Sequence, residues 1–150
     1  KKTSQNRWEQ AVTVPPSLIT DFKKLGALKK LRKGAVLFRQ GSPARAAFLL
    51  REGSVRLTLA AGNEPLHSRT VRPGYLLGLP GTLGNHKYNF TAEALTGCEV
   101  IYVRRAALLK ALRQSGDICL HIVQVLGGEL LSLAGPKAAD TQAKLRAASL

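Results

Sequence analysis

The sequence contains few acidic residues, few cysteines and no long apolar run. Its 9 aspartates and glutamates stand against 23 lysines and arginines, which gives a net charge of +14. Carboxylates this sparse, together with the lack of a Gly-x-Ser-x-Gly motif, argue against acid/base and nucleophilic catalysis. No apolar run reaches the roughly 18 residues of a membrane span, and Lys1 and Lys2 precede no apolar signal core. We therefore expect a cytoplasmic protein that is not an enzyme and has no membrane partner.

The residues that hold metals and cofactors are also scarce. Two cysteines, Cys98 and Cys119, form neither a disulfide framework nor a CxxC motif. The three histidines, His67, His86 and His121, are not clustered as a metal site of the cupin type requires. No cysteine precedes Cys98, which argues against an iron–sulfur cluster, and nothing selects a haem-binding histidine. We therefore expect no catalytic residue, no metal and no cofactor.

Half of the excess positive charge lies in residues 1–33, which carry nine basic residues and two acidic ones. A basic patch of this kind favours an anionic partner such as nucleic acid. The same residues also fit a solvated surface, because long basic side chains cover apolar surface with their stems. Both interpretations stay open at this point.

The spacing of apolar residues predicts a short helix followed by many strands. Residues 1–14 form a polar arm, and Pro15 and Pro16 then open a helix that Gly26 ends. From Ala27 the apolar period falls to about 2. The candidate strands are Leu28–Lys33, Val36–Arg39, Ala47–Arg51, Ser54–Ala60, Leu66–Val71, Tyr75–Gly78, Asn89–Leu95 and Cys98–Val103. Short strands separated by Gly, Pro and Asn turns predict a mainly β protein with flanking helices, built on an eight-stranded antiparallel β-roll or jelly roll.

Two helices are predicted after the strands. A short amphipathic helix ends at Ser115 and Gly116, and Asp117 is expected to cap a longer helix from Ile118 to about Ala134. One apolar stripe of this longer helix has the alternating spacing of a coiled-coil seam. Its residues are Cys119, Val123, Leu126, Leu130 and Leu133.

A second stripe on the same helix consists of Ile118, Ile122 and Val125. A helix that is apolar on two faces needs two partners, so we expect one face on the β-roll and the other on a second copy in a homodimer. Gly127 would allow the two backbones to approach closely. The alternative is a monomer in which the helix is fully buried.

The segment Pro73–Leu95, with four glycines and two prolines, is the candidate ligand site. The candidate ligand-binding residues are Gly78, Leu79, Pro80, Gly81, Thr82, Tyr88, Asn89 and Thr91. Backbone amides of Gly81, Thr82 and Gly84 would form an anion-binding nest, with neutral hydrogen bonds from the side chains of Tyr88, Asn89 and Thr91. In the alternative interpretation, nothing binds because four apolar side chains fill the roll. These are Leu77, Leu79, Leu83 and Phe90.

A framework of glycines and apolar residues runs through the chain. It comprises residues 33–44, residues 48–57, Pro73-Gly74, Leu77-Gly78, Thr91-Ala92 and Cys98-Glu99-Val100. This framework resembles the cyclic-nucleotide-binding fold and, more narrowly, the sensory domain of Crp/Fnr-family transcription regulators, over about residues 15–134. The resemblance implies that a small molecule in the roll repositions the long helix at a homodimer interface. It also implies that a C-terminal helix-turn-helix domain, not included in these 150 residues, binds DNA.

The chain departs from the family pattern at the two charged positions of the cassette. Family members that bind cyclic nucleotides have a Glu after the cassette glycine, and an Arg about ten residues later that pairs with the cyclic phosphate. Here Leu79 follows Gly78, and Tyr88, Asn89 and Phe90 occupy the Arg region. We therefore expect a small-molecule effector other than cAMP, of unknown identity, or none.

The resemblance divides the chain into four parts. They are an arm (1–14), an effector-binding-like domain (15–116), a dimerisation helix (117–134), and a hinge with the start of a DNA-binding domain (135–150). The alternative function is a stand-alone interaction domain that uses its basic face or its dimer helix. A helix-turn-helix encoded in frame after Leu150 would support the regulator, and a stop codon would support the alternative.

Overall fold

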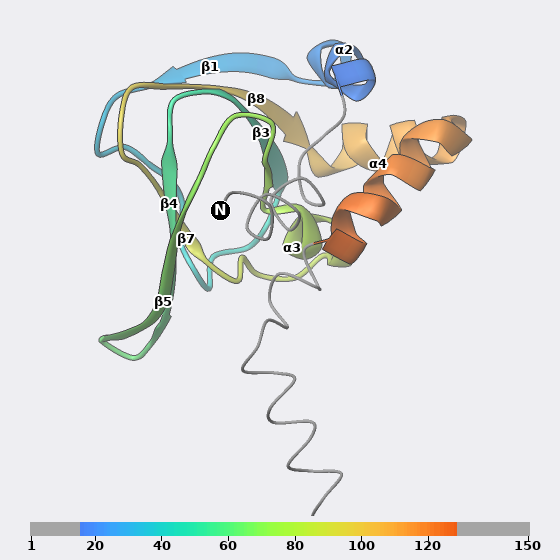
Figure 1. Ribbon diagram of the computed structural model, residues 1–150. Coiled ribbons are helices and arrows are strands. Elements are labelled where there is room, and N and C mark those ends of the chain that lie inside the picture. Colours follow the sequence, from blue (N-terminus) through green and yellow to red (C-terminus); the bar gives the residue numbers. More distant parts are fainter. Residues whose placement is uncertain (1–15, 129–150) are drawn as a thin grey trace, which may run out of the picture.

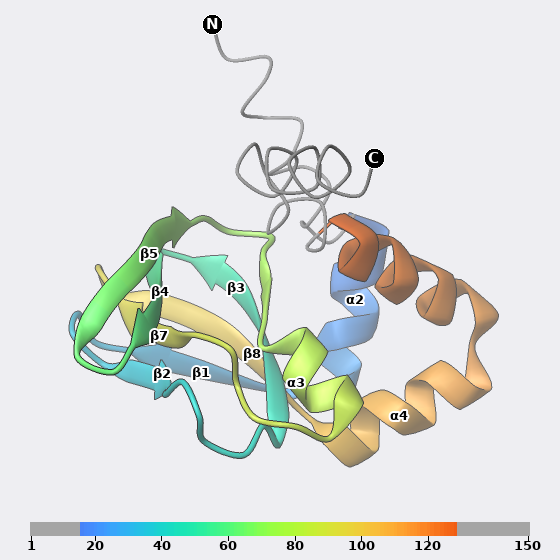
Figure 2. The same cartoon turned by 90° about the horizontal axis from the view of Figure 1, so that it is seen from below.

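The computed structural model describes residues 16–128, in which two antiparallel sheets form a roll with helices on one side (Figure 1). The strands are β1 (Ala27–Leu31), β2 (Val36–Phe38), β3 (Ala46–Glu52), β4 (Val55–Ala61), β5 (Glu64–Val71), β6 (Leu76–Leu77), β7 (Thr91–Ala94) and β8 (Cys98–Arg104). The helices are α2 (Pro16–Leu25), α3 (Leu79–Gly84) and α4 (Arg105–Gln114). A further helix, here called the long helix, begins at residue 116 and continues to residue 128, the last one described. Figure 2 shows the sheets on the left and the helices gathered on the right.

The strand order is β1-β8-β3-β6 in one sheet and β2-β7-β4-β5 in the other, with antiparallel pairing throughout. The predicted fold is confirmed, because all eight candidate strands are present with their ends shifted by at most two residues. The strand predicted over Asn89–Leu95 begins only at Thr91. The strand predicted over Tyr75–Gly78 contains only Leu76 and Leu77. Helix α3 was not predicted.

Two apolar cores flank the sheet that contains β3 and β8. Phe48 and Leu50 face the first core, inside the roll, whereas Leu49 faces the second core, between this sheet and the helices. Successive side chains of a strand point to opposite faces, so a strand with a core on each side is apolar throughout. This explains the uninterrupted apolar run of β3, in which residues 46–50 are all buried.

Helix α2 covers the second core, as its apolar spacing predicted. Leu18 and Phe22 are 2% and 0% exposed and pack in that core. The helix ends at Gly26, whose amide donates to the carbonyl of Phe22 over 3.1 Å. A Cβ at this position would lie 2.3 Å from the carbonyl oxygen of Tyr102. Gly26 therefore stops the helix where the chain passes directly against β8.

Ser115 caps the long helix, so the predicted cap, Asp117, is wrong. The amide of Ile118 donates to the Ser115 hydroxyl oxygen over 3.2 Å, and the amide of Cys119 donates to the Ser115 carbonyl over 3.1 Å. Ser115 has the extended backbone (φ −132°, ψ 112°) expected of a cap residue. Serine and aspartate cap helices about equally well, so residue type alone did not distinguish the two positions.

The second apolar stripe of the long helix packs on the body, as expected. Ile122 and Val125 are each 2% exposed in the second core, and Ile118 packs against it. On the predicted seam, Val123 is 57% exposed, whereas Leu126 is partly buried against the same core. Cys119, also on the seam, is a partly buried free cysteine. The last two seam residues, Leu130 and Leu133, and the helix expected after residue 140 lie outside the described residues.

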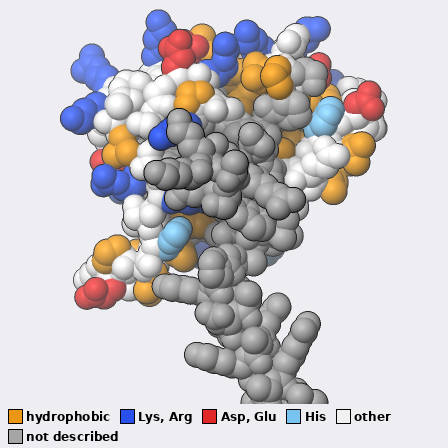
Figure 3. Space-filling model, viewed as in Figure 1, with side chains coloured by type: hydrophobic (Ala, Val, Ile, Leu, Met, Phe, Trp, Pro, Cys, Tyr) orange, Lys and Arg blue, Asp and Glu red, His pale blue; other side chains and the backbone are white. Residues whose placement is uncertain are grey.

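Basic side chains cover the edge of the roll that carries β1. All six lysines and arginines between residues 16 and 33 are exposed, and Figure 3 shows Lys and Arg side chains along the upper edge of the molecule. The ammonium of Lys29 lies 4.1 Å from the ring centroid of Tyr102 on the neighbouring strand. Within residues 16–128, no helix has the length and apolar character needed to cross a bilayer.

Candidate functional site

The predicted cassette turns at Gly78, which has a left-handed backbone (φ 75°) and leads from β6 directly into α3. A Cβ on Gly78 would lie 2.7 Å from Cε1 of Tyr88. A positive φ and a close approach both favour glycine here. The turn is also held by Thr82, whose amide and hydroxyl donate to the Gly78 carbonyl over 3.2 and 2.7 Å.

The amides of Gly81, Thr82 and Gly84 do not form the predicted anion-binding nest. All three residues lie in α3, and no residue from 79 to 84 has a positive φ, whereas a nest alternates right-handed and left-handed residues. Helix α3 was not predicted because two glycines and a proline in six residues are poor helix formers. It packs instead on β3 and α4, with Leu79 0% exposed in the second core.

Tyr88 is fixed in the wall of the roll. Its ring stacks on Phe38 with a centroid distance of 4.0 Å and an interplanar angle of 16°. Its hydroxyl donates to the carbonyl of Ala46 over 2.6 Å, and the Thr82 hydroxyl oxygen lies 2.9 Å from the same carbonyl oxygen. Burial raises the pKa of the Tyr88 hydroxyl, against the opposing effect of its hydrogen bond to Ala46. A hydroxyl held in this way stabilises the fold and has little freedom to form a hydrogen bond with a ligand.

Replacing Tyr88 with phenylalanine is expected to reduce the decrease in the free energy of unfolding at alkaline pH. A hydroxyl whose pKa is raised on folding contributes stability below its unfolded pKa of about 10 and loses it as the pH rises through the folded pKa. The wild type should therefore lose more free energy of unfolding than Tyr88→Phe between about pH 9 and pH 11. At neutral pH the variant should be about 1 kcal/mol less stable. Urea denaturation followed by circular dichroism measures both effects.

The control for the loss at neutral pH is Tyr102→Phe, which removes a hydroxyl from a ring that is only partly buried, under Lys29. This variant should cost less stability at neutral pH than Tyr88→Phe. Parallel stability curves for the wild type and Tyr88→Phe would contradict the assignment to Tyr88.

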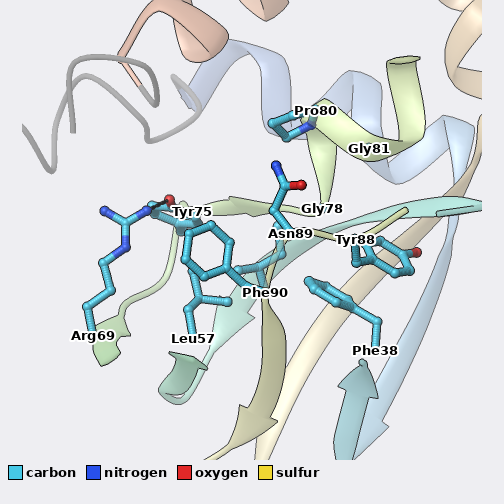
Figure 4. A pocket seen from close by; sticks show the side chains of 11 residues that line it. Phe38, Leu57, Arg69, Tyr75, Gly78, Pro80, Gly81, Tyr88, Asn89 and Phe90 are labelled. Carbon is cyan, nitrogen blue, oxygen red and sulfur yellow. Dashed lines mark hydrogen bonds between the residues drawn. The ribbon is translucent and has the colours of Figure 1, made fainter. Parts of the chain in front are cut away.

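A narrow cavity opens beside Tyr88 inside the roll (Figure 4). It measures about 450 Å³ including its open mouth, and its enclosed part is small. Pockets for small molecules usually measure about 300–1,000 Å³.

Five of the eight predicted ligand residues line this cavity: Gly78, Pro80, Gly81, Tyr88 and Asn89. The other three do not. Leu79 points into the second core, and the Thr82 hydroxyl is bound to backbone carbonyls. The Thr91 hydroxyl accepts from the amide of Gln40 over 3.0 Å. Of the five predicted residues that line the cavity, Asn89 is the one with an exposed polar side chain.

Only two of the four apolar side chains that were expected to fill the roll lie inside it. Leu77 is buried in the first core and Phe90 packs against it. Leu79 and Leu83 belong to the second core, on the helix side of the sheet. The roll is thus less completely filled than that interpretation required.

The cavity is also lined by Leu77 and Phe90, which the alternative interpretation placed in the roll. Four further lining residues were not indicated by the sequence: Phe38, Leu57, Arg69 and Tyr75. Arg69 of β5 lies opposite Leu57 of β4, and Leu57 is 3% exposed inside the roll. Residues directly opposite in an antiparallel pair share a face, so Arg69 faces inward. Counting from the turn at Gly62 would place Ser68 opposite Leu57, and an irregularity between Leu59 and Ala60 shifts the register by one residue, so no signal in the sequence indicated Arg69.

Comparison with known proteins matches residues 28–115 to the family described as the cyclic nucleotide-binding domain. The catabolite activator protein of Thermus thermophilus has a TM-score of 0.69 and 21% identity over 89% of this chain, which spans 60% of its length. The N-terminal domain of a transcriptional regulator from Streptomyces coelicolor has a TM-score of 0.63 and 17% identity, with 81% and 88% of the two chains covered.

A third solved structure is described by the words "a cyclic-GMP-dependent signalling pathway regulates bacterial phytopathogenesis". It has a TM-score of 0.72 and 17% identity, and covers 81% of this chain and 97% of its own. No curated protein matches the sequence significantly. At these identities the structural likeness establishes the fold.

Proposed function

The chain belongs to the cyclic nucleotide-binding domain family, and from this premise we propose that it is the sensory and dimerisation part of a Crp/Fnr-type transcription regulator. In this proposal the roll responds to a small-molecule effector other than cAMP or cGMP. The long helix joins two copies, and a C-terminal helix-turn-helix domain binds DNA. The similarity to a catabolite activator protein and to a transcriptional regulator supports this assignment.

The observation that carries the proposal is the surface of the long helix. One stripe is buried on the body through Ile122 and Val125, while Leu120 and Val123 are each 57% exposed. A Cβ added at Gly127 would have no atom within 4 Å, so a second backbone has room to approach at this point. Apolar side chains this exposed on one helix face support contact with a second copy of the chain.

The altered cassette supports an effector other than a cyclic nucleotide. Leu79, at the position of the family's ribose-binding Glu, is 0% exposed and turned into the second core. Asn89 and Phe90, in the region of the family's phosphate-binding Arg, are uncharged and line the cavity. A cyclic phosphate bound at that place would lose its hydration without gaining a guanidinium partner, which is unfavourable.

Calorimetric titration of the 150-residue chain with cAMP and with cGMP should detect no binding at micromolar concentrations. The reason is that neither Leu79 nor Asn89 replaces the charged group that the family uses. A single substitution provides the control: Asn89→Arg places a guanidinium among the residues that line the cavity and should raise the affinity above that of the wild type. A dissociation constant of about 10 µM or tighter for either nucleotide with the wild type would contradict the proposal.

A second candidate is a stand-alone interaction domain that uses its basic face. The exposed lysines and arginines along β1 and α2 favour it. The reading frame after Leu150 separates the two functions, because a regulator requires a DNA-binding domain there. Because β1 is an edge strand, its lysines also oppose pairing of this sheet edge with other chains.

A further inference from the structure

One surface of the molecule, here called the basic face, combines the end of α2, strand β1 and the turn after β1. Its basic side chains are Lys23, Lys24, Lys29, Lys30, Arg32 and Lys33, all of them exposed. Helix α2 and β1 are in contact, and Figure 3 shows lysines and arginines along the edge where Figure 1 draws both elements. The fold therefore gathers these charges from a helix and a strand on one edge of the molecule.

Acidic side chains offset only part of this charge. Asp21 of α2 and Glu99 of β8, which lies opposite Lys30, are both partly buried. Glu52 is exposed, but it lies on β3, beyond β8 in the sheet order. Within residues 16–33, every charged side chain that is exposed is positive. A surface with this excess of one sign attracts a partner that carries many negative charges.

The composition of the basic face favours phosphate groups over a protein or a lipid surface. Five of its six cations are lysines, and lysine is depleted in protein–protein interfaces, where aromatic residues and arginine are enriched. A lysine ammonium binds phosphate as a point charge without a fixed geometry. Among the described residues of this segment, Leu28 is the one large apolar side chain that is exposed, whereas binding at a membrane surface buries a whole apolar face.

The basic face is held in place and is long enough to meet several phosphates. The ammonium of Lys29 lies 4.1 Å from the ring centroid of Tyr102, and Leu18 and Phe22 anchor α2 in the second core. All five residues of β1 pair with β8, and a strand of this length spans about 13 Å. Duplex DNA carries one negative charge per about 1.7 Å of its axis, so a duplex along β1 brings several phosphates to these side chains.

We propose that the basic face binds the phosphate backbone of double-stranded DNA, whatever its base sequence. Contacts to phosphate supply affinity and carry no direct sequence information. This inference goes beyond the proposed function, in which a C-terminal domain binds DNA, because it gives the roll a DNA contact of its own. In a regulator with both contacts, the contact at the roll strengthens binding to every DNA site alike.

The test is a titration of a fluorescently labelled duplex of about 20 base pairs with the 150-residue chain, followed by anisotropy at about 50 mM salt. The wild type should bind with a dissociation constant of about 10 µM or tighter, and its affinity should fall steeply with salt. The triple variant Lys29→Gln, Lys30→Gln, Lys33→Gln should bind at least about tenfold more weakly. It should also reduce the slope of log affinity against log salt by about 2–3, because each phosphate contact contributes about 0.9.

The matched control removes the same number of charges elsewhere, through Arg56→Gln, Arg72→Gln and Lys87→Gln. These exposed residues lie on β4, just after β5 and after α3. Its affinity for the duplex should stay within about twofold of the wild type. The two triple variants have the same net charge, and the basic residues of 1–15 and 129–150 are unchanged in both. A difference between them therefore measures the basic face and not the overall charge.

A second variant keeps the β1 lysines, in case their removal lets this sheet edge pair with other chains. Lys23→Gln, Lys24→Gln, Lys33→Gln should also bind the duplex at least several-fold more weakly than the wild type. Circular dichroism and light scattering check the folding and the mass of each variant.

The inference is overturned if the wild type does not bind the duplex at low salt, or if the control variant loses as much affinity as the Lys29 triple variant. It is also overturned if polyglutamate or phosphatidylserine vesicles displace the duplex at an equal concentration of negative charge, because the partner would then be an acidic protein or a membrane. The light-scattering mass keeps this inference apart from the proposed function, since a dimer that does not bind the duplex contradicts only the DNA contact of the roll.

Discussion

Replacing Gly53 with alanine is expected to lower the free energy of unfolding by about 3 kcal/mol, from a left-handed backbone cost of about 1–2 kcal/mol and a similar overpacking cost. Gly53 joins β3 to β4 with φ +87°. An added Cβ would lie 2.4 Å from the carbonyl oxygen of Gly97 and 2.8 Å from the sulfur of Cys98. Because the first contact is with backbone, the turn between β7 and β8 would have to move.

This turn cannot move freely, since it is bonded to the β3–β4 turn. The amide of Leu95 donates to the Ser54 carbonyl over 2.9 Å, and the amide of Ser54 donates to the Thr96 hydroxyl oxygen over 3.1 Å. Urea denaturation at a fixed protein concentration measures the loss, which should also lower the melting temperature by about 10 °C.

Gly34→Ala is the matched control. Gly34 has φ +88°, but an added Cβ would meet no atom within 4 Å. This variant should therefore lose only the backbone cost, about 1–2 kcal/mol, and the difference between the two variants measures the contact at Gly53. Equal losses at Gly53 and Gly34 would show that the two turns are not packed as described.

Replacing Val123 with aspartate is expected to convert a dimer into a monomer. If the exposed face of the long helix joins two copies, the substitution places two carboxylates in one apolar interface, because a two-fold dimer uses the same surface twice. Burying charges without partners is strongly unfavourable. The dimer dissociation constant should rise at least about a hundredfold, or about 2.7 kcal/mol. Light scattering at tens of micromolar protein measures the mass.

Leu66→Asp provides the control for this substitution. Leu66 is 63% exposed, close to the 57% of Val123, but it lies on the β4–β5 hairpin. The Leu66→Asp variant should remain a dimer and unfold like the wild type. A wild type that is monomeric at this concentration, or a Val123→Asp variant that stays dimeric, would contradict the dimer assignment.

Much of the architecture was accessible from local patterns. Eight strands were predicted with ends shifted by at most two residues, because period-2 alternation and the glycines between strands are properties of short segments. The helix ended by Gly26 was predicted for the same reason. The errors fall where two local solutions compete: Ser115 and Asp117 are both good caps, and only the backbone conformation of Ser115 selects it.

The candidate site could be predicted only in part from the sequence. The Pro73–Leu95 segment was identified by its glycines, and five of its predicted residues do line the cavity. Helix α3 was missed because its sequence is unsuited to a helix on its own, and packing on β3 and α4 stabilises it. Leu79 was placed in the roll because it follows the cassette glycine, whereas the left-handed Gly78 turns the chain toward the second core.

The strands, the turns and the uncharged residues Leu79 and Asn89 could be read from the sequence, because each is a matter of residue type within a few positions. That Arg69 faces the cavity and Leu79 does not follows from the tertiary structure. The direction of a side chain in a closed roll depends on the register between strands and on which face of each sheet the helices cover. Both are set by contacts between residues distant in the chain.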